Sequence, residues 1–165
     1  MTLEQINSLP QAEFVDALGW IFEHSPWVAE RAWAKRPFAD IDGLHAAMRS
    51  VVEGASREEQ LALLRAHPDL GTRLPLTAAS RAEQAGAGFD QLENAELDAL
   101  RASNLAYREK FGIPFIYAVK GRPARDILYA MQTRFGNTPE EEFREAFYHV
   151  YRIAYFRITD RVDRS

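Results

Sequence analysis

The sequence predicts an all-α fold, a single-domain bundle of about seven or eight helices with one extended apolar segment near residues 113–119. Three observations support this prediction. Apolar side chains recur at spacings of three and four residues, capping residues precede these stretches, and glycine or proline follows them. The chain has 165 residues, about the size of one domain, and no repeat or linker divides it, so residues 1–165 are assigned to a single domain.

The N-terminal third predicts three helices whose apolar faces include aromatic residues. The first follows Ser8 and Pro10, and its apolar face comprises Phe14, Leu18, Ile21 and Phe22. Ser25 is a candidate N-cap, and Pro26 suits the first turn of a second helix over residues 27–33. The third helix ends at Gly54, after an apolar face of Leu44, Met48, Val51 and Val52.

Capping residues predict where the later helices begin. The candidate N-caps, in chain order, are Ser56, Thr77, Asn94 and Thr138. The glutamates three residues after Ser56 and Thr138 complete capping boxes. The predicted helix ends are Pro68, Gly86, Gly112 and, for a helix from about Pro123 to Phe135, Gly136. The last helix has an apolar face made of Phe143, Phe147, Val150, Ala154 and Ile158.

Residues 113–119, with the sequence IPFIYAV, are the exception to the helical pattern. Their β-branched and aromatic side chains favour an extended backbone. A single strand cannot form a sheet, so this segment is expected to pass between helices as extended chain.

The composition excludes several classes of function. The chain has no cysteine, so it contains no disulfide, no thiolate nucleophile and no Cys-ligated metal. Its formal net charge is -4, and its basic residues form no run, which argues against nucleic-acid binding. No apolar stretch approaches the roughly 20 residues of a membrane span, and no signal peptide is recognisable, so a cytoplasmic protein is expected.

His67 is the most informative of the four histidines, because it follows a predicted helix and precedes Pro68. An imidazole at a helix end can face a pocket, and its unperturbed pKa of about 6.5 suits proton transfer near neutral pH. The alternative is a structural histidine that hydrogen-bonds the last carbonyls of its helix. Local sequence alone favours the structural alternative.

Ser80, Glu83 and Gln84 lie on one side of the short helix predicted after Thr77, since residues three and four apart are neighbours on a helix. Their hydroxyl, carboxylate and carboxamide groups can bind a small polar ligand rich in hydrogen-bonding groups. A solvated helix face is the simpler alternative.

Arg157 lies three residues after Ala154, close to the apolar face of the last helix. A buried guanidinium without partners is costly. Its aliphatic stem therefore either extends to the rim so that the charge reaches water, or the guanidinium faces a pocket and binds an anion. Both alternatives stay open at this point.

Five motifs follow one another along the chain: residues 67–70 (HPDL), 80–84 (SRAEQ), 107–116 (YREKFGIPFI), 119–122 (VKGR) and 153–158 (IAYFRI). Their order and spacing resemble the 2-oxo-4-hydroxy-4-carboxy-5-ureidoimidazoline (OHCU) decarboxylases of urate degradation. The resemblance covers nearly the whole chain, from about Phe14 to Val162. Residues 71–73 depart from the family pattern after HPDL, and the loop before Ser80 is short.

The resemblance implies an all-helical homodimer that uses no metal or organic cofactor and decarboxylates OHCU to S-(+)-allantoin and carbon dioxide. The family's catalytic histidine corresponds to His67, its substrate-orienting glutamate to Glu83 and its arginine to Arg157. Further substrate contacts are expected from Pro68, Ser80, Gln84, Phe115, Ile116, Tyr117, Ala118 and Val119.

The chemistry of these residues fits such a reaction. The conjugated ring of the substrate can receive the electrons of the breaking bond, so the protein has to position the substrate and manage protons. His67 is expected to exchange a proton, and Arg157 is expected to be the local cation that draws an anionic substrate. Backbone groups of residues 115–119, which are unpaired in any sheet, are expected to hydrogen-bond the ring.

Two alternative functions remain at this stage. In the first, the chain is a family relative that uses the same His, Glu and Arg residues to act on another small ureido or heterocyclic acid. It can also be a non-catalytic helical ligand-binding module, in which Glu83 and Arg157 face solvent and are dispensable.

Overall fold

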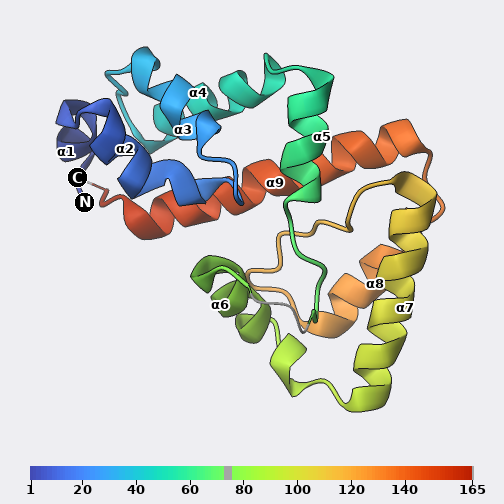
Figure 1. Cartoon of the computed structure of the whole chain (residues 1–165). Helices are drawn as coiled ribbons and strands as arrows, with labels where there is room; N and C mark the ends of the chain where they lie inside the picture. The colour runs from blue at the N-terminus through green and yellow to red at the C-terminus, as the bar shows by residue number, and fades with distance from the viewer. Residues whose placement is uncertain (73–75, 165) are drawn as a thin grey trace. The chain divides into compact units, whose positions relative to one another are not determined.

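The computed structural model describes residues 1–72 and 76–164 and confirms the all-α prediction (Figure 1). The described residues form nine α-helices, three short 3-10 helices and no strand. Residue contacts divide the chain into two compact units, each of which is described by itself. Unit 1 comprises Met1–Ala66 and Tyr151–Ser165, and unit 2 comprises His67–Val150.

Unit 1 consists of the helices before residue 66 and the second part of the C-terminal helix. Its α-helices are α1 (Leu3–Ser8), α2 (Gln11–Leu18), α3 (Trp27–Ala32), α4 (Ile41–Glu53), α5 (Arg57–Arg65) and the end of α9 (Pro139–Arg161). The 3-10 helices η1 (Gly19–Ile21) and η2 (Trp33–Lys35) follow α2 and α3. The apolar faces predicted for α2, α4 and α9 are buried except at Phe143, which is half-buried; the buried side chains include Phe14, Leu44, Met48, Ala154 and Ile158.

Local capping explains most helix boundaries of unit 1. Ser56 and Glu59 form the predicted capping box at the start of α5, and Gly54 is the C-cap of α4. Helix α1 was not predicted, although Thr2 and Gln5 form a capping box at its start. This additional short helix accounts for the difference between the predicted seven or eight helices and the nine observed in the described residues.

The cap predicted at Ser25 is wrong. Helix α3 begins at Trp27 after Pro26 and has no side-chain cap, and the buried Ser25 hydroxyl donates to the Glu23 carbonyl at 2.9 Å. His24, whose side chain is exposed, adopts a left-handed backbone with φ of 46°. The segment between η1 and α3 is therefore a tight turn held by its own polar groups.

Unit 2 contains α6 (Ala78–Gly86), η3 (Phe89–Gln91), α7 (Asn94–Phe111), α8 (Ala124–Arg134) and the first part of α9. Thr77 caps α6 and Thr138 caps α9 as predicted, each accepting a backbone N–H at 3.2 Å. The N-cap of α7 is Glu93 rather than the predicted Asn94, because the Glu96 carboxylate accepts the Glu93 N–H at 3.2 Å. Gly112 ends α7 with φ of 71°.

Residues 114–119 are neither helix nor strand, which agrees with the predicted extended segment. Phe115, Ile116, Ala118 and Val119 in this segment are nevertheless buried. A buried irregular segment needs partners for its backbone groups, and side chains of α8 and α9 provide some of them, as described below.

A fully buried carboxylate, Glu142 of α9, organises the interior of unit 2. It accepts hydrogen bonds from the Tyr107 hydroxyl, from Arg134 Nε at 2.8 Å and from Asn137 Nδ2 at 2.9 Å. Arg134 also donates through Nη1 to the Ile116 carbonyl at 2.8 Å. This network connects α7, α8 and α9 to the extended segment.

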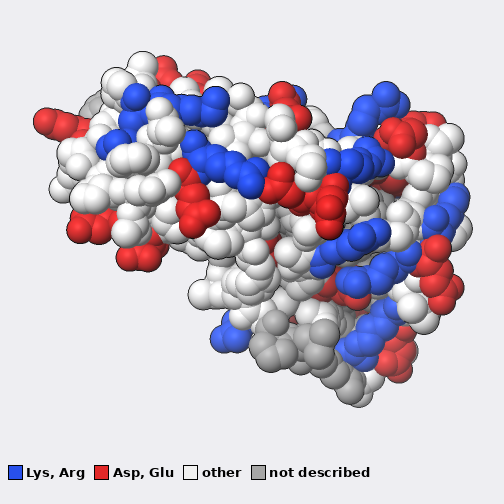
Figure 2. Space-filling view, turned by 45° about the horizontal axis from the view of Figure 1, so that its top comes forward, with Lys and Arg blue, Asp and Glu red and all other residues white. Residues whose placement is uncertain are grey.

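The described helices include none that is long and apolar enough to cross a membrane. On the face shown in Figure 2, Lys and Arg side chains are interspersed with Asp and Glu. This distribution agrees with the absence of a basic run in the sequence.

Tyr151 of α9 makes the stability of unit 1 sensitive to alkaline pH. Burial raises the pKa of its hydroxyl from 10.0 to about 12; the nearby Glu53 raises it too, whereas Arg49 lowers it. The folded state therefore retains the proton at pH values where the unfolded chain has lost it. The resulting stabilisation is complete below pH 10 and is lost as the pH rises through about 12.

The free energy of unfolding of the wild type should fall between pH 9 and pH 11. In Tyr151→Phe this fall is expected to be smaller by about 1 kcal/mol. Urea unfolding at the two pH values measures this difference. Tyr129 is 72% exposed, so Tyr129→Phe serves as the control and should leave the difference unchanged. An equal loss of stability in Tyr151→Phe and the wild type would contradict the prediction.

Candidate active site

The predicted site residues belong to both units. His67, Pro68, the α6 residues and the segment 115–119 are in unit 2, whereas Arg157 is in unit 1.

His67 begins unit 2, two residues after the end of α5, and its exposed fraction is 7%. Pro68 follows it and restricts the backbone of His67 to extended conformations. The imidazole is therefore part of a buried turn rather than a solvated helix end. We call residues 67–71 the His67 loop.

Helix α7 holds the His67 loop at two consecutive positions. Arg108 Nη2 lies 2.8 Å from Asp69 Oδ1 in an ion pair, and Asn104 Nδ2 donates to the Leu70 carbonyl at 3.0 Å. Asn104 and Arg108 are one helical turn apart, so they lie on the same face of α7. Asn104 is 2% exposed, whereas the Asp69–Arg108 pair is partly exposed.

Helix α6 holds the next position of the loop. The Gly71 N–H donates to Gln84 Oε1 at 2.8 Å. Gly71 has φ of 68°, and a Cβ atom there would lie 2.7 Å from Leu100 Cδ2 of α7. Only glycine combines this left-handed backbone with so close an approach to a helix. Three consecutive residues after Pro68 are thus fixed by side chains of α6 and α7.

The α6 face predicted to bind a ligand is not a solvated helix face. Ser80 and Gln84 are each 7% exposed, and Glu83 is partly exposed beside them. The solvated alternative is therefore wrong for Ser80 and Gln84. Gln84 has a structural contact as well, since its carboxamide oxygen holds the His67 loop.

The extended segment is anchored by His149 of α9. The Ala118 N–H donates to His149 Nδ1 at 3.0 Å, and the His149 ring stacks on Tyr117 with centroids 4.4 Å apart. A backbone N–H can only donate, so Nδ1 is the acceptor and the proton of the neutral ring lies on Nε2. Nε2 is 3.4 Å from Glu145 Oε1.

Several backbone groups of the extended segment already have protein partners. The Ala118 N–H is bonded to His149, the Ile116 carbonyl accepts from Arg134, and the Val119 carbonyl accepts from the Arg122 N–H at 3.0 Å. The expectation that the backbone groups of residues 115–119 await a ligand is therefore wrong for the Ala118 N–H, whose one hydrogen is donated to His149, whereas a carbonyl oxygen that accepts one hydrogen bond can accept another.

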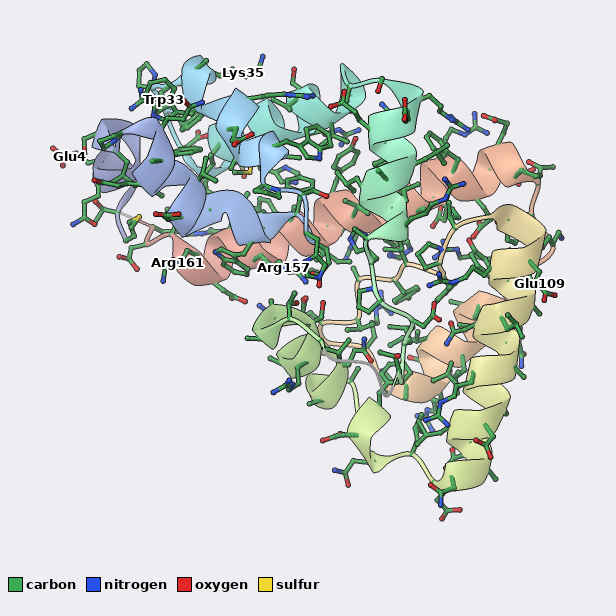
Figure 3. The ribbon with its side chains drawn as sticks, in the orientation of Figure 1. Glu4, Trp33, Lys35, Glu109, Arg157 and Arg161 are labelled. Carbon is green, nitrogen blue, oxygen red and sulfur yellow. The ribbon has the colours of Figure 1, made fainter. Side chains whose placement is uncertain are left out.

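Arg157 is buried, with an exposed fraction of 5%, and α9 continues beyond it to Arg161 (Figure 3). Its Nη1 lies 3.0 Å from Glu23 Oε2, so the guanidinium is in an ion pair within unit 1. The alternative in which the charge extends to the rim is therefore wrong. The sequence did not predict the carboxylate partner.

Sequence reasoning missed five residues that hold either a predicted site residue or the His67 loop: Glu23, Asn104, Arg108, Arg134 and His149. Asn104 had a usable signal, because it lies four residues after Leu100 and three before Tyr107, on the buried side of α7. A polar residue at such a position needs a partner. Glu23 had no comparable signal, since it lies in a turn.

Each unit carries chemical groups suited to binding a small polar substrate. Unit 2 offers an imidazole, a carboxylate, a hydroxyl and a carboxamide, and unit 1 offers a guanidinium. Within residues 1–72 and 76–164, no three His, Asp or Glu side chains converge as a metal-binding group.

Comparisons with known proteins give one consistent family. The model of the OHCU decarboxylase family matches residues 7–159. A 2-oxo-4-hydroxy-4-carboxy-5-ureidoimidazoline decarboxylase of Haloferax volcanii is 50% identical over 161 residues, which cover 98% of this chain and 96% of that protein. A uric acid degradation bifunctional protein of Bacillus subtilis is 42% identical over 96% of this chain and 32% of its own length.

A solved structure agrees with these similarities. The crystal structure of an (S)-allantoin synthase superposes with a TM-score of 0.79 at 35% sequence identity. The match covers 99% of this chain and 54% of that chain.

The two α7 contacts with the His67 loop should contribute unequally to stability. Asn104→Ala leaves the buried Leu70 carbonyl without its donor and is expected to cost about 1–3 kcal/mol. Arg108→Ala removes a partly exposed ion pair and is expected to cost less than about 1 kcal/mol. Urea unfolding of both variants measures the order, and a larger loss for Arg108→Ala would refute this account of the loop.

Proposed function

This chain belongs to the OHCU decarboxylase family, and from that premise we propose that it converts OHCU to (S)-allantoin and carbon dioxide in urate degradation. It is a carbon–carbon lyase of the decarboxylase type. The observation in the structure that carries the proposal is the His67 loop, in which a buried imidazole is followed by three residues that α6 and α7 hold in place. Such fixation is what a group that exchanges protons with a bound substrate requires.

The reaction breaks the bond between ring carbon 4 and its carboxylate, and carbon dioxide leaves. The electron pair passes into the carbon–nitrogen double bond of the ring, whose nitrogen takes up a proton. The 4-hydroxyl then loses its proton as the ring carbonyl forms, while the ring carbon that bears the ureido group gains one. Because the substrate accepts the electron pair itself, the residues of the chain bind it and move protons.

We propose catalytic roles for three residues. His67 exchanges a proton with the substrate, as acceptor from the 4-hydroxyl or as donor to the ring carbon. Glu83 accepts hydrogen bonds from the N–H groups of the ureido arm, which suits a carboxylate that is partly exposed on α6. Arg157 donates to an anionic or carbonyl oxygen of the substrate.

Further substrate contacts are proposed from the remaining predicted residues. Pro68 supports the imidazole, and Ser80 and Gln84 offer polar groups on the buried face of α6. Gln84 would use its amide nitrogen, since its oxygen accepts the Gly71 N–H. Residues 115–119 contribute side chains and those backbone groups that protein partners do not occupy.

The range matched by the family model supports one domain over residues 1–165. We propose that the protein works in the cytoplasm, without metal or organic cofactor, as a homodimer.

The non-catalytic alternative required Glu83 and Arg157 to face solvent. The burial of Arg157 and its ion pair with a buried carboxylate disfavour that alternative. An enzyme acting on another ureido acid is tested by comparing turnover of several ring-opened purine products.

His67→Asn is expected to abolish decarboxylation while the helical circular dichroism stays unchanged. Freshly prepared OHCU is mixed with protein, and its loss is followed together with the enantiomer of allantoin formed. Wild-type protein should accelerate the loss and yield only the S enantiomer, because one face of the ring is protonated. Near-wild-type turnover in His67→Asn would remove this residue from the mechanism.

The matched control for this experiment is His24→Asn. The His24 side chain is exposed, and its left-handed backbone is one that asparagine adopts readily. This variant should retain wild-type turnover, so a loss in both variants would indicate a general effect of replacing histidine.

Sedimentation equilibrium should give twice the chain mass of 18.8 kDa if the chain forms the proposed homodimer. A mass equal to that of one chain at micromolar concentration would contradict it. The decarboxylation assay is independent of this result.

A further inference from the structure

Glu23 and Arg157 form a buried ion pair within unit 1. The side chain of Glu23 is 1% exposed and that of Arg157 is 6% exposed, with 3.0 Å between Oε2 and Nη1. Removing either charge from water is costly, and the pair is tolerated only in a geometry that compensates both. An ion pair on the surface has no such requirement. The buried contact therefore restrains the Arg157 side chain more than the exposed ion pairs of the chain restrain theirs.

Two carbonyls accept from the nitrogen of Arg157 that lies beside the Glu23 carboxylate. The carbonyls of Trp20 and Ile21 accept from Nη1 at 3.2 and 3.4 Å, and Glu23 Oε2 lies 3.0 Å from the same Nη1 as its ion-pair partner. A guanidinium is planar, so fixing one of its nitrogens from several directions also fixes the orientation of the rest. Residues 20–23 therefore form a cradle for the end of the Arg157 side chain.

The cradle is itself held from both sides. The Trp20 indole Nε1 donates to the Ala17 carbonyl at 2.9 Å, and the buried Ser25 hydroxyl donates to the Glu23 carbonyl at 2.9 Å. The Trp20 ring also lies 5.9 Å from Arg157 Cζ, within the range of a cation–π contact. Glu23 is consequently placed by local structure that does not depend on a ligand.

The ion pair changes the electrostatic role expected of Arg157. The sequence led us to expect a cation that draws an anionic substrate by its charge. With Glu23 beside it, the pair carries no net charge, so attraction at long range is weak. What remains is a donor with a fixed direction, which acts over hydrogen-bond distances.

We propose that Glu23 is a positioning residue for the decarboxylation: it sets the orientation in which Arg157 meets the substrate. This inference rests on the role of Arg157 in the proposed function. Glu23 itself need not touch the substrate, and its effect on turnover passes through Arg157.

A double-mutant cycle tests whether the effect of Glu23 passes through Arg157. Glu23→Gln keeps the size and an acceptor oxygen but removes the charge, and Arg157→Gln removes the guanidinium. The two single variants and the double variant are compared with the wild type. For each, kcat and KM for OHCU, the Kd for (S)-allantoin and the Tm are measured.

Glu23→Gln is expected to lower kcat/KM by about 10-fold in the wild-type background and by less than about twofold in the Arg157→Gln background. It should also raise the Kd for (S)-allantoin, in the same direction as Arg157→Gln. A residue that only stabilises the fold would reduce the fraction of active molecules, so kcat would fall while KM stayed constant. The Tm of the double variant should exceed that of Glu23→Gln, because no buried cation is left unbalanced.

The matched control is Glu53→Gln, which removes the same group from an exposed ion pair with Arg49 in unit 1. It should leave kcat, KM and the Kd for (S)-allantoin unchanged. If Glu23→Gln fails to fold, Glu23→Asp replaces it. This variant keeps the charge but retracts the carboxylate by one methylene, so kcat/KM is expected to fall by less than the value predicted for Glu23→Gln.

The outcomes separate this inference from the proposed function. If Arg157→Gln is inactive and Glu23→Gln behaves like the wild type, the positioning role is overturned while the catalytic role of Arg157 stands. Independent, multiplying effects of the two substitutions also overturn it. If the wild-type protein does not decarboxylate OHCU, the proposed function is wrong. If the wild type is active and Arg157→Gln is equally active, the proposed role of Arg157 is wrong.

Discussion

The buried carboxylate of Glu142 is the constraint on which unit 2 depends. A carboxylate removed from water requires partners on most of its lone pairs, and here a tyrosine of α7, an arginine of α8 and the asparagine before α9 provide them. These elements can satisfy Glu142 only in one relative arrangement. Because the same arginine also holds the Ile116 carbonyl, the packing of these helices is coupled to the extended segment through one buried charge.

Signals that act within one helical turn were sufficient to predict most of the fold. The caps at Ser56, Thr77 and Thr138 are where the sequence places them, because a capping hydrogen bond joins residues only three positions apart. The predicted caps at Ser25 and Asn94 are wrong. At Ser25 the hydroxyl donates to the Glu23 carbonyl and caps no helix, and at Asn94 a capping box of Glu93 and Glu96 starts the helix one residue earlier.

The candidate site was predictable only as a set of residues, because its geometry depends on contacts between distant parts of the chain. The His67 loop is held from positions 34 and 39 residues away, and the carbonyl of Trp20 meets Arg157 across 137 positions. No local pattern encodes such pairs. The resemblance identified His67, Glu83 and Arg157, but it gave no indication that Glu23 neutralises the arginine or that α7 anchors the loop.

The discontinuity of unit 1 has a consequence for synthesis on the ribosome. Residues 67–150 form unit 2 without interruption, whereas the core of unit 1 includes Ala154, Ile158 and Val162 from the far end of the sequence. The first 66 residues therefore emerge early but lack part of their apolar interior until α9 has been translated. During that interval Glu23 also lacks its cation, so unit 1 can complete its native packing only after all of unit 2 has been translated.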